Sequence, residues 1–259
     1  MKKKEKNYVW LSACSIVGFL FIWWLVTDGL HLAAPQSLPS PIKVMTTFVQ
    51  KFYTKAPEGA TMGQHILASL QVALSGYLIG VTVGVPLGIL MAWYEKVDIF
   101  VRPLFDLLRP IPGIAWIPIM IVLFGIGLLS KAMVIFLSAF IACVVNSYSG
   151  IRQTKTVHLW VGQTFGATNF QLLTRIALPT ALPMMLTGMR VALGGAWTAL
   201  VAAELVASTK GLGFMIQQSR GIFRPDVIIA GMIAIGLTGA ALTGLLSILE
   251  KKLMKGERW

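Results

Sequence analysis

Residues Ile66–Trp93 read ILASLQVALSGYLIGVTVGVPLGILMAW, a stretch without a single charged side chain. A helix needs roughly 20 apolar residues to cross the hydrocarbon core of a bilayer. The same stretch carries Gly76, Gly80, Gly84 and Gly88 at every fourth position. Steps of four residues place these glycines on one slowly drifting stripe of a helix. The stretch therefore predicts a transmembrane helix with a glycine face.

The glycine stripe has two interpretations. Small residues let a neighbouring helix approach closely, which is the main packing device between helices in lipid. The neighbour can be another helix of the same chain, or it can belong to a second subunit across a sliding interface. The residue pattern alone leaves both open.

The composition extends the membrane prediction to the whole chain. Of its 259 residues, 56% are hydrophobic and 12% are charged. Soluble proteins carry about 25% charged residues. The chain therefore lacks the polar surface of an ordinary soluble enzyme, and it is neither a disordered chain nor a coiled coil. It is predicted to be an integral membrane protein.

The hydropathy pattern predicts an all-α, polytopic membrane protein with six transmembrane helices. We expect these spans near residues 9–26, 66–93, 111–128, 133–148, 183–207 and 227–249. The chain then divides into a cytoplasmic stub with the first helix (1–27), an extracytoplasmic or interfacial segment (28–65), a core of five helices (66–250) and a basic tail (251–259). The interfacial segment is expected to hold a short helix near 42–52, and residues 149–182 form the longest cytoplasmic loop.

The basic residues predict the orientation. Lysine and arginine number 22 and give the chain a formal net charge of +12. Cytoplasmic loops of membrane proteins carry an excess of these residues. If the N-terminus is cytoplasmic, fifteen of the 22 fall on the cytoplasmic side of the six spans. Both termini are therefore expected in the cytoplasm, and the basic excess needs no nucleic-acid partner.

A proline-rich run begins the third predicted span. It reads Arg109-Pro-Ile-Pro-Gly-Ile-Ala-Trp-Ile-Pro118. Prolines at these positions cannot lie in an uninterrupted helix without freeing backbone groups, and broken helices in transporters often flank the solute path. Alternatively, Pro110 and Pro112 simply begin the helix at the membrane interface.

Three polar residues are candidates for a translocation path or gate: Arg109, Asn146 and Glu204. Glu204 is the only acidic residue well inside a predicted span. An ionised carboxylate there is costly, so it is expected to face a cavity or a partner. A gating role competes with a structural salt bridge to Lys210 or to an arginine.

Several kinds of site are absent from the sequence. There is no Gly-x4-Gly-Lys-[Ser/Thr] phosphate loop, and no Gly-x-Ser-x-Gly or His-Glu-x-x-His pattern. The three histidines are isolated, and Cys14 and Cys143 both lie in apolar runs, so neither a metal site nor a disulfide is expected. The chain is therefore predicted to be a transport protein rather than an enzyme, with no cofactor of its own.

The most specific motif lies in the long cytoplasmic loop. Residues Gly166–Pro179 follow the pattern Gly-x9-Ile-x-Leu-Pro, and they resemble the signature loop of permease subunits of binding-protein-dependent ABC importers. The resemblance implies a short coupling helix that docks on an ATPase subunit. The residues that it assigns to the coupling loop are Gly166, Ala167, Phe170, Leu173, Ile176, Leu178 and Pro179. Gly166 is expected at a tight bend, and Phe170, Leu172, Leu173 and Ile176 are expected to be exposed. Trp160, Val161 and Gly162 stand where the family usually has Glu-Ala-Ala.

The resemblance also implies the assembly. A chain of this kind is expected to adopt the type I importer permease (MetI-like) fold in a bacterial inner membrane. Its partners would be a second copy of itself, two ATPase subunits that bind ATP and Mg²⁺, and an extracytoplasmic solute-binding protein.

Further short motifs are similar to the nitrate, sulfonate and taurine branch of that family. They are Leu38–Pro41, His65–Leu70, Arg109–Pro112, Phe124–Gly127 with Ser130-Lys131, and Gly211–Gly213. They imply import of a small anion such as taurine, another alkanesulfonate or nitrate. A bicarbonate or a thiamine-precursor pyrimidine is the alternative within the branch, and an ATP-independent secondary transporter or channel is the alternative outside it.

Overall fold

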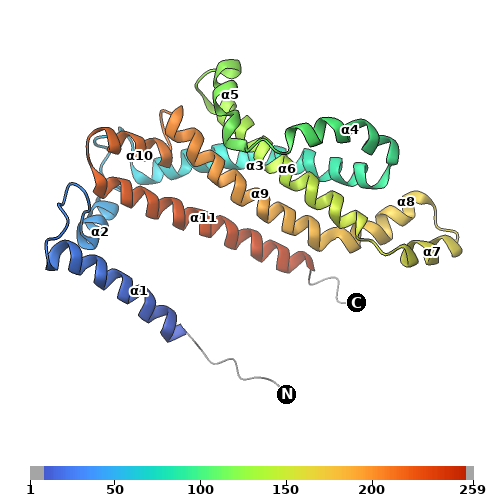
Figure 1. Ribbon diagram of the computed structural model, residues 1–259, viewed down its shortest axis with the longest axis horizontal. Coiled ribbons are helices and arrows are strands. Elements are labelled where there is room, and N and C mark those ends of the chain that lie inside the picture. The colour runs from blue at the N-terminus through green and yellow to red at the C-terminus, as the bar shows by residue number, and fades with distance from the viewer. Residues whose placement is uncertain (1–8, 255–259) are drawn as a thin grey trace.

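A computed structural model describes residues 9–254 of the chain, and every regular element in that part is helical. The longer helices run lengthwise through an elongated molecule (Figure 1). In chain order the elements are α1 (Val9–Trp24), the π-turn η1 (Leu25–Gly29), α2 (Pro41–Gln50), α3 (Met62–Trp93), α4 (Glu95–Leu108), the 3₁₀ turn η2 (Gly113–Trp116), α5 (Ile117–Phe124), α6 (Leu128–Arg152), α7 (Thr156–Thr164), α8 (Asn169–Leu172), the π-turn η3 (Leu173–Ala177), α9 (Leu178–Val206), α10 (Leu212–Gly221) and α11 (Pro225–Met254).

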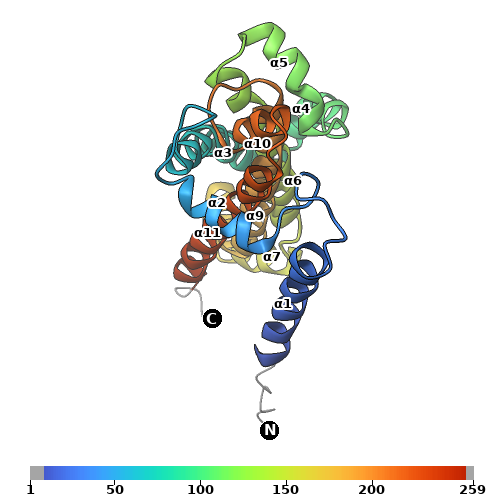
Figure 2. The same ribbon diagram turned by 90° about the vertical axis from the view of Figure 1, so that its left-hand side faces the viewer.

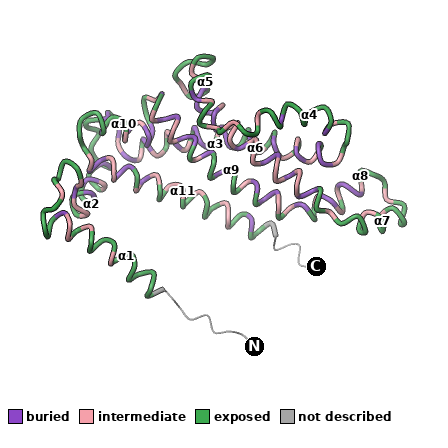
Figure 3. The backbone as a smooth tube through the Cα atoms, viewed as in Figure 1, coloured by how far each residue is buried: buried purple, intermediate pink, exposed green. Residues whose placement is uncertain are grey.

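The core consists of α3, α6 and α9, where most of the buried residues lie (Figure 3). Small residues bring these helices together. Ala139 and Cys143 of α6 pack with Ala192 and Ala196 of α9, and all four are at most 1% exposed. Small side chains at facing positions allow the close packing that holds helices together in lipid.

Helix α1 stands apart from this core. It lies away from α3, α6 and α9 in both views (Figures 1 and 2), and only 6% of its most apolar window is buried. The indole Nε1 of Trp23 donates a hydrogen bond of 3.1 Å to the carbonyl oxygen of Pro39. The prolines in the following segment lead to α2, which begins at Pro41 with Ser40 as its N-cap.

The part of the chain that is described contains five helices long and apolar enough to cross a membrane, or six spans if one bent pair counts as a span. The prediction of an all-α membrane protein is confirmed. The predicted third span, 111–128, is not a continuous helix. Its place is taken by α4 and the η2–α5 unit, which meet at an angle of 83°.

The proline run explains the bend. Helix α4 ends at Leu108, and regular structure resumes at Gly113, so the break covers Pro110 and Pro112. Each proline removes a backbone N–H donor and hinders the preceding helical turn. Gly125, with φ of 73°, then ends α5. The interpretation of a broken helix therefore fits the structure, and the break joins α5 to the charged helix α4.

The two ends of the bundle carry different elements. Helices α7 and α8 lie at one end, and α2 and α10 lie at the other (Figure 1). Helix α11 begins beside α10 and ends toward α7 and α8. The predicted N-terminal stub before Val9 and residues 255–259 of the basic tail lie outside the described residues.

Candidate functional site

The long loop between α6 and α9 folds as two short helices around a glycine. Helix α7 ends at Thr164, and Gly166 follows with φ of 77°. This left-handed conformation costs an L-residue about 1–2 kcal/mol, but it costs glycine little. Thr168 then caps α8, and a capping box with Gln171 fixes the helix start. The sequence therefore sets both the bend and the restart of the chain.

The apolar side chains of this loop divide into an exposed set and a buried set. Phe165 and Phe170 are 86% and 69% exposed, and Trp160 of α7 is 61% exposed. The expectation that Leu172 and Leu173 are also exposed is wrong, because they are only 4% and 6% exposed. Leu173 packs against a cluster that includes Ala92, Ile151, Ala177, Ala181 and Met185. The surface available to a partner is therefore aromatic and formed mainly by α7 and the Gly166 turn.

The remaining loop residues complete the connection to α9. The amide nitrogen of Ala167 lies 3.0 Å from the carbonyl oxygen of Gly162, which closes the turn. Ile176 is half-buried in η3, and Leu178 and Pro179 form the start of α9.

Close packing explains why residue 162 is a glycine. A Cβ atom at this position would lie 2.6 Å from Leu172 Cδ2 and 2.8 Å from Ile176 Cδ1. The absence of a side chain thus lets α7 pack closely on the α8–η3 turn. This position belongs to the triplet that replaces the usual Glu-Ala-Ala, and the structure gives a steric explanation for its third residue.

The glycine stripe of α3 faces α6. A Cβ atom at Gly76 would lie 2.5 Å from the carbonyl oxygen of Ala132, and one at Gly80 would lie 2.6 Å from Ala139 Cβ. Gly84 and Gly88 face the next turns of α6 in the same way. These glycines therefore pack two helices of the same chain together.

Glu204 is buried at the end of α9, close to α10, and only 1% of it is exposed. The Ser69 hydroxyl of α3 lies 2.8 Å and 2.9 Å from the two carboxylate oxygens, and the amide nitrogen of Gly213 donates at 2.9 Å. No salt bridge between Glu204 and Lys210 or an arginine occurs within residues 9–254. The carboxylate thus binds a hydroxyl and a backbone amide, which sequence reasoning did not anticipate.

The segment that follows α9 is shaped around this carboxylate. A Cβ atom at Gly211 would lie 2.5 Å from Glu204 Oε2, and one at Gly213 would lie 2.7 Å from Glu204 Cβ. Gly211 also has φ of 132°. Both glycines are therefore required by the close approach of the backbone to Glu204.

Two side chains of α3 bind the backbone of the same segment. The amide nitrogen of Leu212 donates to Ser69 Oγ at 2.9 Å, and that of Gly211 donates to His65 Nδ1 at 3.1 Å. His65 is fully buried, and its Nε2 atom has no partner in the described structure. Ser69 therefore serves both the carboxylate and the backbone, so it is not an activated nucleophile with His65 as its base.

The other two candidate path residues lie elsewhere. Asn146 of α6 is half-buried, donates to the carbonyl oxygen of Ala142 at 2.8 Å and packs against Gly188 of α9. Arg109 is exposed at the end of α4 and lines a cavity of about 200 Å³ with Arg102, Asp106 and Ser149. The three predicted residues are therefore not brought together in one site within the described structure.

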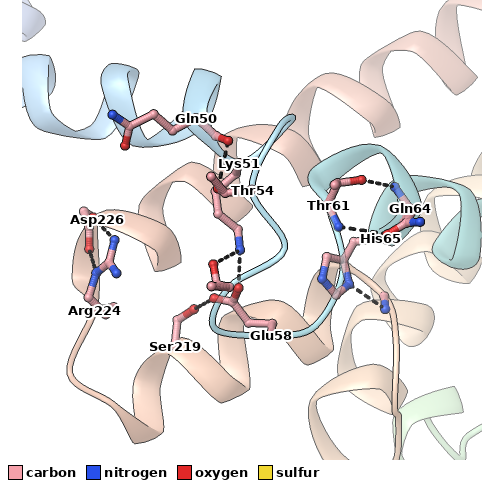
Figure 4. Close-up of polar contacts among 12 residues, drawn as sticks. Gln50, Lys51, Thr54, Glu58, Thr61, Gln64, His65, Ser219, Arg224 and Asp226 are labelled. Atoms are coloured by element: carbon pink, nitrogen blue, oxygen red, sulfur yellow. Dashed lines mark hydrogen bonds and ion pairs between the residues drawn. The ribbon is translucent and has the colours of Figure 1, made fainter.

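A second buried polar cluster fastens the loop after α2 to α10 (Figure 4). Lys51 Nζ forms a salt bridge with Glu58, and its side chain is 4% exposed while that of Glu58 is fully buried. Lys51 also donates to the carbonyl oxygen of Ala56 at 3.1 Å, and the Ser219 hydroxyl donates to Glu58 at 2.8 Å. Each charge of this pair is therefore hydrogen-bonded on more than one side.

A third polar group joins α2 to the start of α11. Thr47 Oγ1 donates to Asp226 Oδ2 at 2.9 Å, and Arg224 binds the same carboxylate through Nε at 2.8 Å and Nη2 at 2.7 Å. The hydrogen bonds that Arg224 donates to the Asp226 carboxylate raise the pKa of Arg224, which therefore stays protonated. The end of the bundle that carries α2 and α10 is thus held together by side-chain bonds across the fold.

The described residues contain no cluster of His, Cys, Asp and Glu able to hold a metal ion. Cys14 is exposed on α1 and Cys143 is buried against Gly84, so the two sulfurs lie in different environments.

Comparison with known proteins finds relatives that match nearly the whole chain. A family model described as "Binding-protein-dependent transport system inner membrane component" matches residues 84–256. The taurine transport system permease protein TauC of Escherichia coli is 37% identical over 95% of this chain and 89% of its own length. A putative aliphatic sulfonates transport permease protein of Bacillus subtilis is 31% identical over 98% of this chain and 90% of its own length. The bicarbonate transport system permease protein CmpB of Synechocystis is 29% identical over 98% and 92%.

Solved structures agree on the fold. A chain of the MetNI methionine ABC transporter, in an inward-facing conformation, superposes with a TM-score of 0.62 at 19% identity. The match covers 75% of this chain and 95% of the other. The chain therefore belongs to the family of binding-protein-dependent transport system inner membrane components. Within that family it belongs to the nitrate, sulfonate and taurine branch of ABC importer permeases.

Proposed function

We propose that this chain is the transmembrane permease subunit of an ATP-driven importer for a small anion, with taurine or another alkanesulfonate as the first candidate. The observation that carries the proposal is the loop α7–Gly166–α8, because it exposes an aromatic surface at one end of the bundle and continues directly into α9. Large exposed apolar patches outside a bilayer mark sites of interaction with another protein.

The proposed assembly contains two copies of this chain, two ATPase subunits that bind ATP and Mg²⁺, and an extracytoplasmic solute-binding protein. The ATPase docks on α7 and α8, so these helices face the cytoplasm and α2 and α10 face the outside. Closure of the ATPase pair moves the loop, and the bundle rocks between inward-open and outward-open states. The excess of basic residues on the same side supports this orientation.

The proposal of an anion rests on the relatives, whose names include taurine, aliphatic sulfonates and bicarbonate. Nitrate, bicarbonate and a thiamine-precursor pyrimidine remain alternative substrates. Selectivity is expected to reside mainly in the solute-binding protein, since it delivers the solute to the permease.

Uptake of labelled taurine, nitrate, bicarbonate and pyrimidine by cells that express the complete system tests the proposal. The expected result is uptake of an anion that stops when the nucleotide site of the ATPase is inactivated. Uptake that continues without ATP hydrolysis would identify a secondary transporter. Absence of anion uptake together with import of the pyrimidine would overturn the substrate assignment.

A further inference from the structure

One continuous helix connects the loop α7–Gly166–α8 with the far end of the bundle. Elements α8, η3 and α9 together form a helical run of 38 residues, Asn169–Val206. Pro179 and Pro183 lie in its first half, and its second half packs against α3 and α6 in the core. One helical run therefore connects α8 with Val206 at the far end of the bundle.

Glu204 lies at the last turn of this helix and binds what comes next. Its carboxylate accepts from the Gly213 amide at 2.9 Å and from Ser69 Oγ of α3 at 2.8 Å and 2.9 Å. Ser69 in turn accepts from the amide nitrogen of Leu212 at 2.9 Å. The connecting segment 207–213 is thus fastened to α9 and α3 by one buried group of hydrogen bonds, here called the Glu204 brace.

The segment that the brace holds forms the wall of a hollow. A cavity of about 200 Å³ is lined by Gln71 of α3, Lys131 of α6 and residues 207–210. Lys131 Nζ donates to Ser208 Oγ at 2.9 Å, and that hydroxyl lies 2.5 Å from the carbonyl oxygen of Lys210. The lining of the hollow therefore includes two basic residues, Lys131 and Lys210, at the end of the bundle opposite α7 and α8, which suits an anion.

The burial of the carboxylate indicates more than packing. A charged group at this depth is costly unless its hydrogen bonds are satisfied, and an apolar residue of similar volume would fill the site without that cost. The brace also demands glycine at 211 and 213, because a side chain there would collide with Glu204. Unlike an apolar side chain, the Glu204 carboxylate attaches the segment to α9 through directional hydrogen bonds.

We propose that Glu204 is a positioning residue: through Ser69 and the Gly213 amide it fastens the segment 207–213 to both α9 and α3, so that movement of the loop α7–Gly166–α8 reshapes the hollow lined by Lys131 and Lys210. The inference rests on the proposed function, because it assumes that ATP hydrolysis by the partner drives the movement of the loop. In this view Glu204 acts on the transported anion through the segment that it holds and not by direct contact.

The experiment uses the complete complex in proteoliposomes, with labelled taurine as the solute. ATP hydrolysis and taurine uptake are measured together for Ser69→Ala, Glu204→Ala and Glu204→Gln. The matched control is Ser75→Ala on the same helix, because the Ser75 hydroxyl bonds only to the carbonyl oxygen of Val72 in its own helix. A pair of spin labels on the exposed positions Leu67 and Thr209 reports whether the segment stays fixed to α3 and leaves both lysines of the hollow in place.

Ser69→Ala removes the bond to Glu204 and the bond from the Leu212 amide, so it is expected to lower the taurine taken up per ATP hydrolysed by at least about fivefold, the factor that corresponds to one lost buried hydrogen bond. Glu204→Ala is expected to lower it further, and Glu204→Gln less, because the amide keeps one acceptor for Gly213. The distance distribution of the labels should broaden in the same order. Ser75→Ala should match the wild type in both measurements.

Two results would overturn the inference. One is a parallel loss of uptake and hydrolysis with an unchanged ratio, which would make Glu204 a residue of folding only. The other is a label distribution in Ser69→Ala and Glu204→Ala as narrow as in the wild type. If the wild-type complex takes up no anion in the presence of ATP, the proposed function is contradicted. The label distances alone then test whether Glu204 holds the segment in place.

Discussion

Arg102 of α4 donates a hydrogen bond of 2.5 Å from Nη2 to the hydroxyl oxygen of Tyr148 on α6. Arg152, the last residue of α6, donates to the same oxygen from Nε at 3.1 Å. Both guanidinium groups also lie over the tyrosine ring, 5.1 Å and 5.6 Å from its centroid. One phenol thus ties the amphipathic helix α4 to the end of α6, directly before the loop that carries α7.

Replacing Tyr148 by phenylalanine separates the two kinds of contact. The variant keeps the ring for both arginines but removes the shared acceptor, so we expect a loss of about 0.5–1.5 kcal/mol in the free energy of unfolding. Tyr148→Leu should cost more, because it also removes the cation–π contacts. Thermal unfolding in detergent measures both. Equal stability of Tyr148→Phe and the wild type would show that the hydroxyl contributes nothing.

The glycine stripe makes a position-specific prediction. Gly80→Ala places a methyl group 2.6 Å from Ala139 Cβ and should destabilise the protein by about 1–3 kcal/mol through overpacking. Gly63 lies on the same helix with no atom within 4 Å of a Cβ at that position. Gly63→Ala should therefore be neutral or stabilise by up to about 1 kcal/mol. The apparent melting temperatures of the two purified variants provide the comparison, and a reversed order would contradict the packing of α3 on α6.

The two faces of the coupling loop should respond differently to truncation. Phe170→Ala removes an exposed ring and is expected to weaken co-purification of the ATPase while leaving the melting temperature of the permease unchanged. Leu173→Ala removes a buried side chain and should cost about 2–5 kcal/mol of stability. If Phe170→Ala lowers the melting temperature as much as Leu173→Ala, the exposed assignment of Phe170 is wrong.

Gly166 offers a conformational test of the same loop. Gly166→Val forces a β-branched residue into φ of 77° and should disrupt the turn between α7 and α8. Asparagine tolerates this conformation, so Gly166→Asn should retain most of the ATPase binding. Pull-down of the ATPase from membranes gives the binding, and the amount of permease in the membrane fraction controls for insertion. Equal binding by both variants would mean that the bend does not matter for docking.

The buried pair Lys51–Glu58 should show strong coupling. Glu58→Gln leaves a buried ammonium without its counter-charge and is expected to cost about 3–5 kcal/mol, whereas Lys51→Met combined with Glu58→Leu should recover much of that loss. A double-mutant cycle of Lys51→Met and Glu58→Leu, measured by thermal unfolding, gives the coupling. Additive effects of the two single variants would contradict a direct interaction.

Local sequence patterns predicted most of the helices because length and hydropathy are sufficient to recognise a straight span. They did not predict α4 or its junction with the η2–α5 unit. That helix carries Glu95, Lys96, Asp98, Arg102 and Asp106, so its composition indicates a helix at the surface. The prolines signalled a break, but only the structure indicates which two helices the break joins.

The polar interactions were the least predictable part. Ser69 and Glu204 are 135 positions apart in the sequence, and Glu58 and Ser219 are 161 apart. No local pattern links such residues, although Gly211 and Gly213 were noted in the sequence for their resemblance alone. Similarly, periodicity could not decide which apolar residues of the loop pack inward, so Leu173 was assigned to the exposed surface together with Phe170.

The helix Asn169–Val206 is longer than the hydrocarbon core of a bilayer is thick. At 1.5 Å per residue its 38 residues extend about 57 Å, whereas the hydrocarbon core of a bilayer is about 30 Å thick. Tilting accommodates only part of this excess. Part of this helix therefore lies outside the hydrocarbon core, and if the excess is at the α8 end, the proposed ATPase works at a distance from the membrane surface.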